Sequence, residues 1–243
     1  MIRVEDLTIG YGSTALQENL SFDVPAGDIF VVLGGSGAGK STLLRHLIGL
    51  ERPMSGAIEI EGLGDPRLAQ GAPHFGVLFQ SGALFGSMTL AQNVALPLER
   101  WTDLDAQTID TIVRWKLRLV GLDGFENHMP SELSGGMRKR AGIARALSYE
   151  SKLLFLDEPS AGLDPVTAVE LDDVIMTLNE SLGLTIVVVT HELASLFKIG
   201  KNCILLDREA RGIIARGDPR ELRDDTTDDR VRSFFNRLSS VGA

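Results

Sequence analysis

The sequence lacks most of the features that would place a protein in an oxidising compartment or within a membrane. Cys203 is the only cysteine among 243 residues, so no disulfide can form within the chain, and a reducing compartment is expected. No apolar run approaches the roughly 18 residues that a membrane-spanning helix needs. The N-terminus has no apolar segment of the signal-peptide kind. We therefore expect any association with a membrane to be peripheral.

Basic residues are also fewer than acidic ones. The chain has 24 Lys and Arg against 33 Asp and Glu, which gives a formal net charge of -9. Such a charge disfavours nucleic acid and anionic lipid as direct partners, because like charges repel at long range. Nucleic acid is therefore not an expected partner, although a local basic patch around Arg138, Lys139 and Arg140 remains an open alternative.

Short apolar segments alternate with helical patterns along the chain. Strands are expected at residues 2–9, 17–24, 29–33, 58–60, 75–79, 153–156 and 186–189, and helices at residues 41–50, 166–182 and 192–199. Between residues 89 and 147 the pattern is helical throughout, with Ile109, Ile112, Val113 and Leu117 at helical spacing. Alternating strands and helices predict an α/β fold with a parallel sheet, here with a helical subdomain inserted.

The last twenty residues form a separate amphipathic segment. Val231, Phe234, Phe235 and Leu238 recur at the spacing of one helical face, after a helix-start signal at residues 226–229. This face either packs on its own domain or docks against a neighbouring subunit.

A glycine-rich loop carries the first sign of chemistry. It follows the apolar strand at 29–33, opens a helix and fits the pattern G-x-x-x-x-G-K-[ST]. Backbone N–H groups of such a loop point at phosphate oxygens, and the helix directs its positive end at the same anion. Lys40 is expected to reach the β- and γ-phosphates, and Ser41 to bind Mg²⁺. The residues are Gly34, Gly35, Ser36, Gly37, Ala38, Gly39, Lys40 and Ser41, followed by Thr42.

Two adjacent acids end the buried strand at 153–156. Asp157 is expected to hold Mg²⁺, directly or through water, and Glu158 is expected to polarise the attacking water. Ligands of open α/β sheets bind at the carboxyl ends of the strands, which is where these acids lie. A solvated strand cap is the alternative, and the phosphate loop upstream argues against it.

The segment Leu133, Ser134, Gly135, Gly136 and Met137 resembles the LSGGQ motif of ABC (ATP-binding cassette) ATPases, with Met137 in place of the usual Gln. The resemblance implies that Ser134, Gly135 and Gly136 complete the γ-phosphate site of the opposite subunit, so that the active unit is a homodimer. Ser134 is also a good N-cap for the helix that follows.

Other positions match the same family in its order along the chain. The resemblance implies that Tyr11 stacks on adenine and that Gln80, in the Q-loop, contacts Mg²⁺ or water. It further implies that Asp164 lies in the D-loop, which crosses the dimer interface, and that His191 is the switch histidine at the γ-phosphate. ATP and Mg²⁺ are the implied ligands, and ATP hydrolysis is the implied activity.

The resemblance implies a P-loop NTPase (RecA-like) core with a parallel sheet, a small N-terminal antiparallel β-subdomain and an inserted α-helical subdomain. We expect a single ABC ATPase domain over residues 1–243. Its core spans residues 1–85 and 151–223, its helical signature subdomain residues 86–150 and its C-terminal tail helix residues 224–243. Family members of this kind sit under integral membrane permease subunits, at the cytoplasmic face of the inner or plasma membrane.

Two stretches resemble the ATPase of Mla/MCE-type lipid transporters. The first lies within residues 79–98 and comprises residues 79–85, which begin with Phe79 and Gln80, residues 88–89 and residues 93–98. The second is residues 133–145. This resemblance implies phospholipid or other lipid as cargo, and an MCE-domain protein as a further partner. Ala83, Leu84, Phe85 and Met88 would suit a permease contact, with ordinary core as the alternative. Another cargo such as amino acids or ions, or a soluble ABC protein acting on ribosomes, DNA or Fe–S assembly, stays open.

Overall fold

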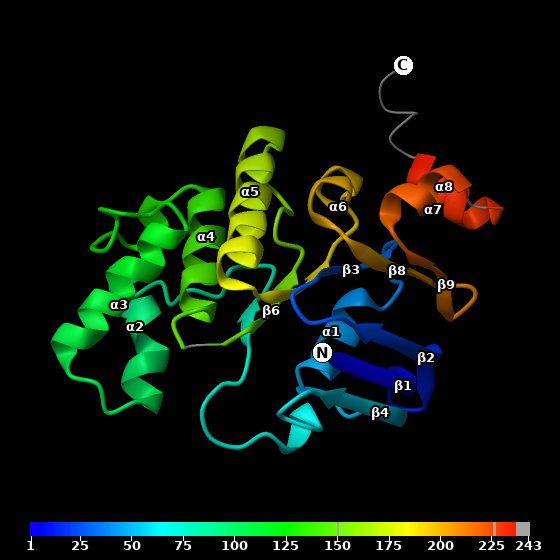
Figure 1. Ribbon diagram of the computed structural model, residues 1–243, viewed down its shortest axis with the longest axis horizontal. Helices are drawn as coiled ribbons and strands as arrows, with labels where there is room; N and C mark the ends of the chain where they lie inside the picture. Colours follow the sequence, from blue (N-terminus) through cyan, green and yellow to red (C-terminus); the bar gives the residue numbers. More distant parts are fainter. Residues whose placement is uncertain (150, 226, 237–243) are drawn as a thin grey trace. The chain divides into compact units, whose positions relative to one another are not determined.

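The structure, a computed structural model, describes residues 1–149, 151–225 and 227–236 (Figure 1). The chain divides into two compact units. Unit 1 comprises Met1–Ala69 and the residues from Thr185 onward, and unit 2 comprises Gln70–Leu184. Each unit is described by itself. None of the helices in the described ranges combines the length and the apolar composition that crossing a bilayer requires.

Unit 1 begins with an antiparallel sheet. It has three strands in the order β2-β1-β4, formed by β1 (Ile2–Tyr11), β2 (Thr14–Val24) and β4 (Ser55–Ile60). Leu20, Phe22 and Val24 alternate along β2 and are all buried, as their period-2 spacing predicts. The small antiparallel β-subdomain expected at the N-terminus is therefore present.

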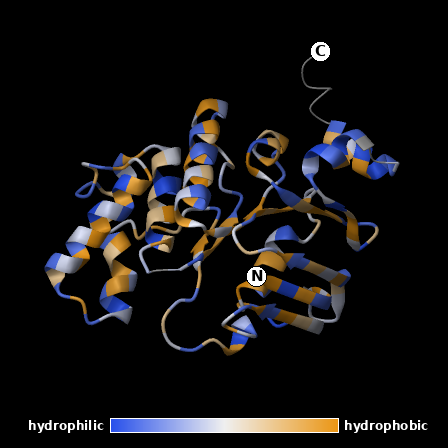
Figure 2. Cartoon of the chain, in the orientation of Figure 1, coloured by the Kyte–Doolittle hydropathy of each residue, from blue (hydrophilic) through white to orange (hydrophobic). Residues whose placement is uncertain are grey.

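The second sheet segment of unit 1 carries the phosphate loop. Strands β7 (Thr185–Val189), β3 (Ile29–Gly34) and β8 (Asn202–Asp207) run parallel, and β9 (Gly212–Gly217) pairs antiparallel with β8. Every residue of β3 and β7 is buried, which explains their continuously apolar sequences. Figure 2 shows this concentration of hydrophobic residues in the strands. Strands β8 and β9 are absent from the sequence-based expectation.

The helices of unit 1 are short. They are α1 (Lys40–Leu47), the 3-10 turn η1 (Pro66–Leu68), α6 (Leu193–Ile199), α7 (Pro219–Asp225) and α8 (Asp229–Phe235). The apolar face of α8 packs on its own unit, because Val231, Phe234 and Phe235 are buried and the ring of Phe235 lies 5.9 Å from that of Phe197. Leu238, the fourth residue of the predicted stripe, lies outside the described residues.

Unit 2 contains two parallel strands and the longer helices. The strands are β5 (Gly76–Leu78) and β6 (Leu153–Asp157). The helices are α2 (Leu90–Trp101), α3 (Ala106–Leu119), the 3-10 turn η2 (Pro130–Glu132), α4 (Gly135–Ala146) and α5 (Pro165–Leu182). Helices α2, α3 and α4 pack together (Figure 1). The helical region expected between residues 89 and 147 is thus resolved into three helices and a 3-10 turn.

Side-chain caps set the starts of the unit 2 helices. Thr89 and Gln92 form a capping box at α2, in which the Thr89 hydroxyl accepts from Gln92 N and the Gln92 amide oxygen accepts from Thr89 N. Asp105 accepts from Thr108 N at α3. Ser134 accepts from Met137 N at α4, as expected for an N-cap.

Candidate functional site

The phosphate loop of unit 1 has the close-packed backbone that its glycines permit. A Cβ on Gly34 would lie 2.8 Å from the Leu206 carbonyl oxygen and 2.9 Å from Ala38 Cβ, so only glycine fits there. Gly39, at the start of α1, has φ 83°, a conformation that costs glycine little. The loop therefore leads from β3 into the N-terminus of α1, which is the arrangement that the sequence predicts.

Lys40 lies within this loop. The residue is only 8% exposed, and its ammonium donates to the carbonyl oxygens of Gly34 at 3.0 Å and Gly35 at 3.3 Å. The hydroxyl of Tyr11 is hydrogen-bonded to that of Thr42 at 2.8 Å, while the Tyr11 residue is 52% exposed. An exposed ring thus stands beside the first turn of α1, where an adenine would find a stacking face.

Gln17 holds the phosphate loop in place through its buried side chain, a role that no sequence motif indicates. It is fully buried, and its amide nitrogen donates to the carbonyl oxygens of Ala38 and Asp207, each at 2.9 Å. Among the described residues its amide oxygen has no hydrogen-bond partner. Gln17 therefore joins β2, the phosphate loop and the end of β8.

Gln17→Leu is expected to lower the free energy of unfolding by about 1–2 kcal/mol, because two buried carbonyls lose a donor while one unpaired amide oxygen is removed. The phosphate loop should also hold ATP less well. Urea denaturation and nucleotide titration measure both effects. Gln107→Leu, on the exposed surface of α3, is the control. Unchanged stability and affinity in Gln17→Leu would show that the loop does not depend on this contact.

His191 follows β7 and is brought to the phosphate loop. A cavity of about 520 Å³ in unit 1 is lined by Gly35 and Ser36 of the loop, by His191 and by Phe234 of α8. The chain positions of His191 and the loop differ by about 150 residues, so this arrangement depends on the parallel pairing of β3 with β7. Phe234 of α8 also lines this cavity, a position that no sequence motif indicates.

The acidic pair of unit 2 lies at the end of β6, where Asp157 is the last strand residue and Glu158 follows it. Leu78 of β5 pairs with Leu156 of β6 in parallel strands. Gln80 and Glu158 each lie two residues after this pair, at the same end of the two strands. Glu158 is 7% exposed and has φ 48°. Such a backbone conformation is uncommon outside glycine, and residues that adopt it cluster at functional sites.

The signature segment, residues 133–137 of unit 2, contains the N-cap and the first residues of α4. A Cβ on Gly136 would collide with the methyl group of Thr167 in α5, so glycine is required for this helix packing. Ser134, the N-cap, is exposed. Backbone N–H groups of the first helical turn are not used within the helix and can bind an anion.

Asp164 is an N-cap of α5 in addition to its predicted place in the D-loop. It accepts from Val166 N and Thr167 N, both at 3.1 Å, and from the Thr167 hydroxyl at 2.6 Å. The Thr167 hydroxyl, followed by these backbone donors, lowers the pKa of the Asp164 carboxyl below its usual value.

Comparison with known proteins decides the family. The ABC transporter family model matches residues 17–161. The chain belongs to the ABC transporter family. A bacterial ABC transporter cassette solved as a dimer matches with a TM-score of 0.79 and 27% identity, over 90% of this chain and 98% of that one. Its post-hydrolysis state with ADP and Pi matches with a TM-score of 0.78. The predicted P-loop NTPase fold is confirmed, and the chain is an ABC ATPase.

Curated relatives of this ABC ATPase include several transport systems. A probable ribonucleotide transport ATP-binding protein of Mycobacterium leprae is 43% identical, over 99% of this chain and 71% of the relative. The intermembrane phospholipid transport system ATP-binding protein MlaF of Escherichia coli is 38% identical, over 98% and 90%. A methionine import ATP-binding protein of Clostridium tetani is 39% identical, over 91% and 70%. The chain is thus an ATP-binding subunit of an ABC transporter.

Proposed function

We propose that two copies of this chain close on two ATP molecules and reopen after hydrolysis. Each ATP is held by the phosphate loop of one copy and by Ser134, Gly135 and Gly136 of the other, whose backbone N–H groups form an anion-binding nest. The observation that carries the proposal is the cavity lined by both the phosphate loop and His191. The exposed N-cap Ser134 and the N-terminus of α4 in unit 2 add an anion-binding group. The solved dimeric cassette supports the pairing of two copies.

The donor chemistry of the chain fits Mg²⁺ held together with ATP. Among the described residues no group of three or more His, Cys, Asp and Glu side chains forms a metal site. Mg²⁺ at nucleotide sites is held by one or two protein oxygens and by phosphate oxygens, so such a cluster is not needed. Ser41, Gln80 and Asp157 would supply oxygen ligands of this kind. Bound Mg²⁺ neutralises charge on the phosphate oxygens.

Hydrolysis then depends on positioned side chains. Lys40 binds the β- and γ-phosphates, and Glu158 accepts a proton from the attacking water. His191 donates to the γ-phosphate, and Gln80 orients the water. Tyr11 stacks on the adenine. Because the phosphoryl transition state has little covalent chemistry for a protein to perform, catalysis is positioning and charge stabilisation.

Lipid is the cargo that we propose, carried by membrane permease subunits and an MCE-domain protein. The likeness to MlaF over almost the whole of both chains supports it, together with the resemblance of residues 79–98 and 133–145 to lipid-transporter ATPases. The subunit would then lie at the cytoplasmic face of the inner or plasma membrane. Relatives named for ribonucleotide and methionine transport make another cargo the alternative.

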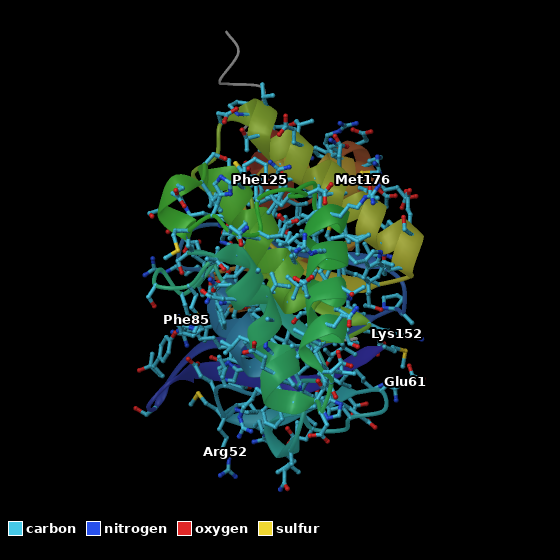
Figure 3. All side chains as sticks on the ribbon, turned by 90° about the vertical axis from the view of Figure 1, so that its left-hand side faces the viewer. Arg52, Glu61, Phe85, Phe125, Lys152 and Met176 are labelled. Carbon is cyan, nitrogen blue, oxygen red and sulfur yellow. The ribbon has the colours of Figure 1, made fainter. Side chains whose placement is uncertain are left out.

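The segment after Gln80 presents the apolar surface on which a permease would dock. Phe85 is 49% exposed and Ala83 is exposed, while Leu84 and Met88 are half-buried, so none of the four is core. Phe85 is labelled at the margin of the side-chain view (Figure 3). Asn93 fixes the segment, because its buried amide accepts from Phe85 N and donates to the carbonyls of Phe85, Met88 and Thr89.

Capture from detergent-solubilised native membranes tests both the partner and the cargo. We expect the tagged chain with ATP to recover a polytopic permease and an MCE-domain protein. Phe85→Asp should reduce the recovery at least about tenfold, because a buried charge without a partner is unfavourable. Leu68→Asp, which changes an equally apolar residue that is 75% exposed in unit 1, is the matched control. Recovery of a different permease would contradict the proposal that lipid is the cargo. Recovery of ribosomal or DNA-bound partners alone would overturn the transporter proposal.

A further inference from the structure

Lys139 is a buried cation that the mechanism above does not use. It lies one turn into α4, the helix that begins at the signature nest, and is only 6% exposed. Its ammonium donates to the carbonyl oxygen of Gln80 at 2.5 Å and to that of Glu158 at 3.1 Å. Burying an ammonium is unfavourable unless its N–H groups are hydrogen-bonded. This side chain therefore connects α4 with both residues that act on the attacking water.

The backbone of Glu158 needs such a restraint. Its φ of 48° lies in the left-handed region, which non-glycine residues adopt rarely. Its carbonyl oxygen accepts from Lys139 Nζ and also from Ala161 N at 3.2 Å. Strained backbone persists only where surrounding contacts hold it. The two donors fix the peptide that carries the Glu158 side chain.

The Q-loop is held by the same helix. After Gln80, Gly82 and Ala83 both have positive φ, at 75° and 49°. Arg145, near the other end of α4, donates to the carbonyl oxygens of Ala83 at 2.5 Å and Gly82 at 3.4 Å. Lys139 holds the start of this loop and also reaches Glu158, whereas the Arg145 guanidinium donates to the loop. Lys139 is thus placed to set the two water-binding residues in one geometry.

We propose that Lys139 is a positioning residue for hydrolysis, which fixes Glu158 and Gln80 relative to each other through hydrogen bonds to their carbonyl oxygens. It acts without touching the nucleotide. The inference rests on the proposed role of Glu158. Because Lys139 and the nest of Ser134, Gly135 and Gly136 share α4, a movement of the signature helix also moves the groups that orient the water.

Paired substitutions separate hydrogen bonding from packing. Lys139→Met keeps most of the side-chain volume but has no donor, and Lys139→Gln keeps two N–H donors on one nitrogen. We expect Lys139→Met to lower kcat roughly 10- to 100-fold, since a small misplacement of catalytic groups has effects of this size. The KM for ATP should change less than about twofold, because the phosphate loop is untouched. Lys139→Gln should recover most of the rate.

The control is Lys116→Met, which removes another buried lysine of unit 2, 7% exposed and on α3. Its kcat should match the parent. Thermal unfolding verifies that each variant is folded. If Lys139→Met fails to fold, Lys139→Thr, whose hydroxyl is too short to reach both carbonyls, carries the same prediction.

A double variant distinguishes failure of this inference from failure of the proposed function. In a Glu158→Gln background, Lys139→Met should lower the residual rate by a much smaller factor than it lowers the parent rate, because the part of its effect that passes through the Glu158 carboxylate is already lost. A folded Lys139→Met with the parent kcat, or a Lys139→Gln as slow as Lys139→Met, would overturn the inference alone. Glu158→Gln that turns over at the parent rate would overturn the proposed role of Glu158, and the inference with it.

Discussion

Glu158→Gln is expected to bind ATP with parent affinity and to lose nearly all hydrolysis. Glu158 directly follows Asp157, the last residue of β6, and is 7% exposed, so an amide of the same size can take its place without a cavity. The amide cannot accept a proton from water. Removal of a general base lowers rates by about 10²- to 10⁴-fold, and a loss in that range is expected. Phosphate release in single and multiple turnover measures it.

Asp173→Asn, a change of the same kind on the exposed surface of α5, is the control for loss of a carboxylate in unit 2. It should turn over at the parent rate. If Glu158→Gln also hydrolyses ATP at the parent rate, Glu158 is not the residue that polarises water.

Lys40→Ala should lose both ATP binding and turnover. The ammonium lies within the phosphate loop, 3.0 Å from the Gly34 carbonyl oxygen, so it is in place to meet phosphate oxygens. Hydrogen bonds to charged groups contribute about 1.5–3 kcal/mol, which corresponds to a loss of affinity of roughly ten- to hundredfold. Calorimetric titration with ATP under non-hydrolysing conditions gives the dissociation constant.

Lys201→Ala, an exposed lysine of unit 1 that follows α6, serves as the control and should bind ATP as the parent does. Unchanged affinity in Lys40→Ala would contradict the assignment of the phosphate loop. The two variants also differ in kind: Glu158→Gln separates binding from hydrolysis, whereas Lys40→Ala removes both.

Those parts of the fold that depend on local pattern could be predicted from the sequence. Strand β3 is continuously apolar and is followed by the glycine loop, and the structure places the loop between β3 and α1 as expected. The same holds for Ser134, whose N-cap position follows from its place before α4. Capping and periodicity act over a few residues, so the sequence displays them directly.

Strands β8 and β9 illustrate what local pattern leaves out. Cys203, Ile204, Leu205 and Leu206 are buried in β8, yet the run is short and lies between charged segments, so no period stands out. β9 is half-buried along most of its length, and its pairing with β8 gives it a strand conformation that its own residues signal weakly. Such segments form strands because of their neighbours in space.

The supporting side chains of the site could not be predicted for the same reason. Gln17 reaches Asp207, 190 residues away in sequence, and Lys139 reaches Gln80, 59 residues away. Gln17 belongs to no motif. Lys139 lies within residues 133–145, but its sequence position indicates only a basic patch, and a Gln or Lys is usually a surface residue. Motifs identify residues that meet the ligand, whereas the residues that hold them are found only in the folded chain.

The central claim is that ATP closes a dimer of this chain, and the mass of Glu158→Gln in solution tests it most directly. Light scattering should give twice the 26.3 kDa of one chain with ATP and Mg²⁺, and a single chain with ADP, because only ATP offers a γ-phosphate to the partner's nest. Mutating that nest, by Ser134→Arg in the same background, should keep the protein monomeric with ATP. A monomer under every nucleotide condition, or a dimer that ignores the nucleotide, would contradict the account.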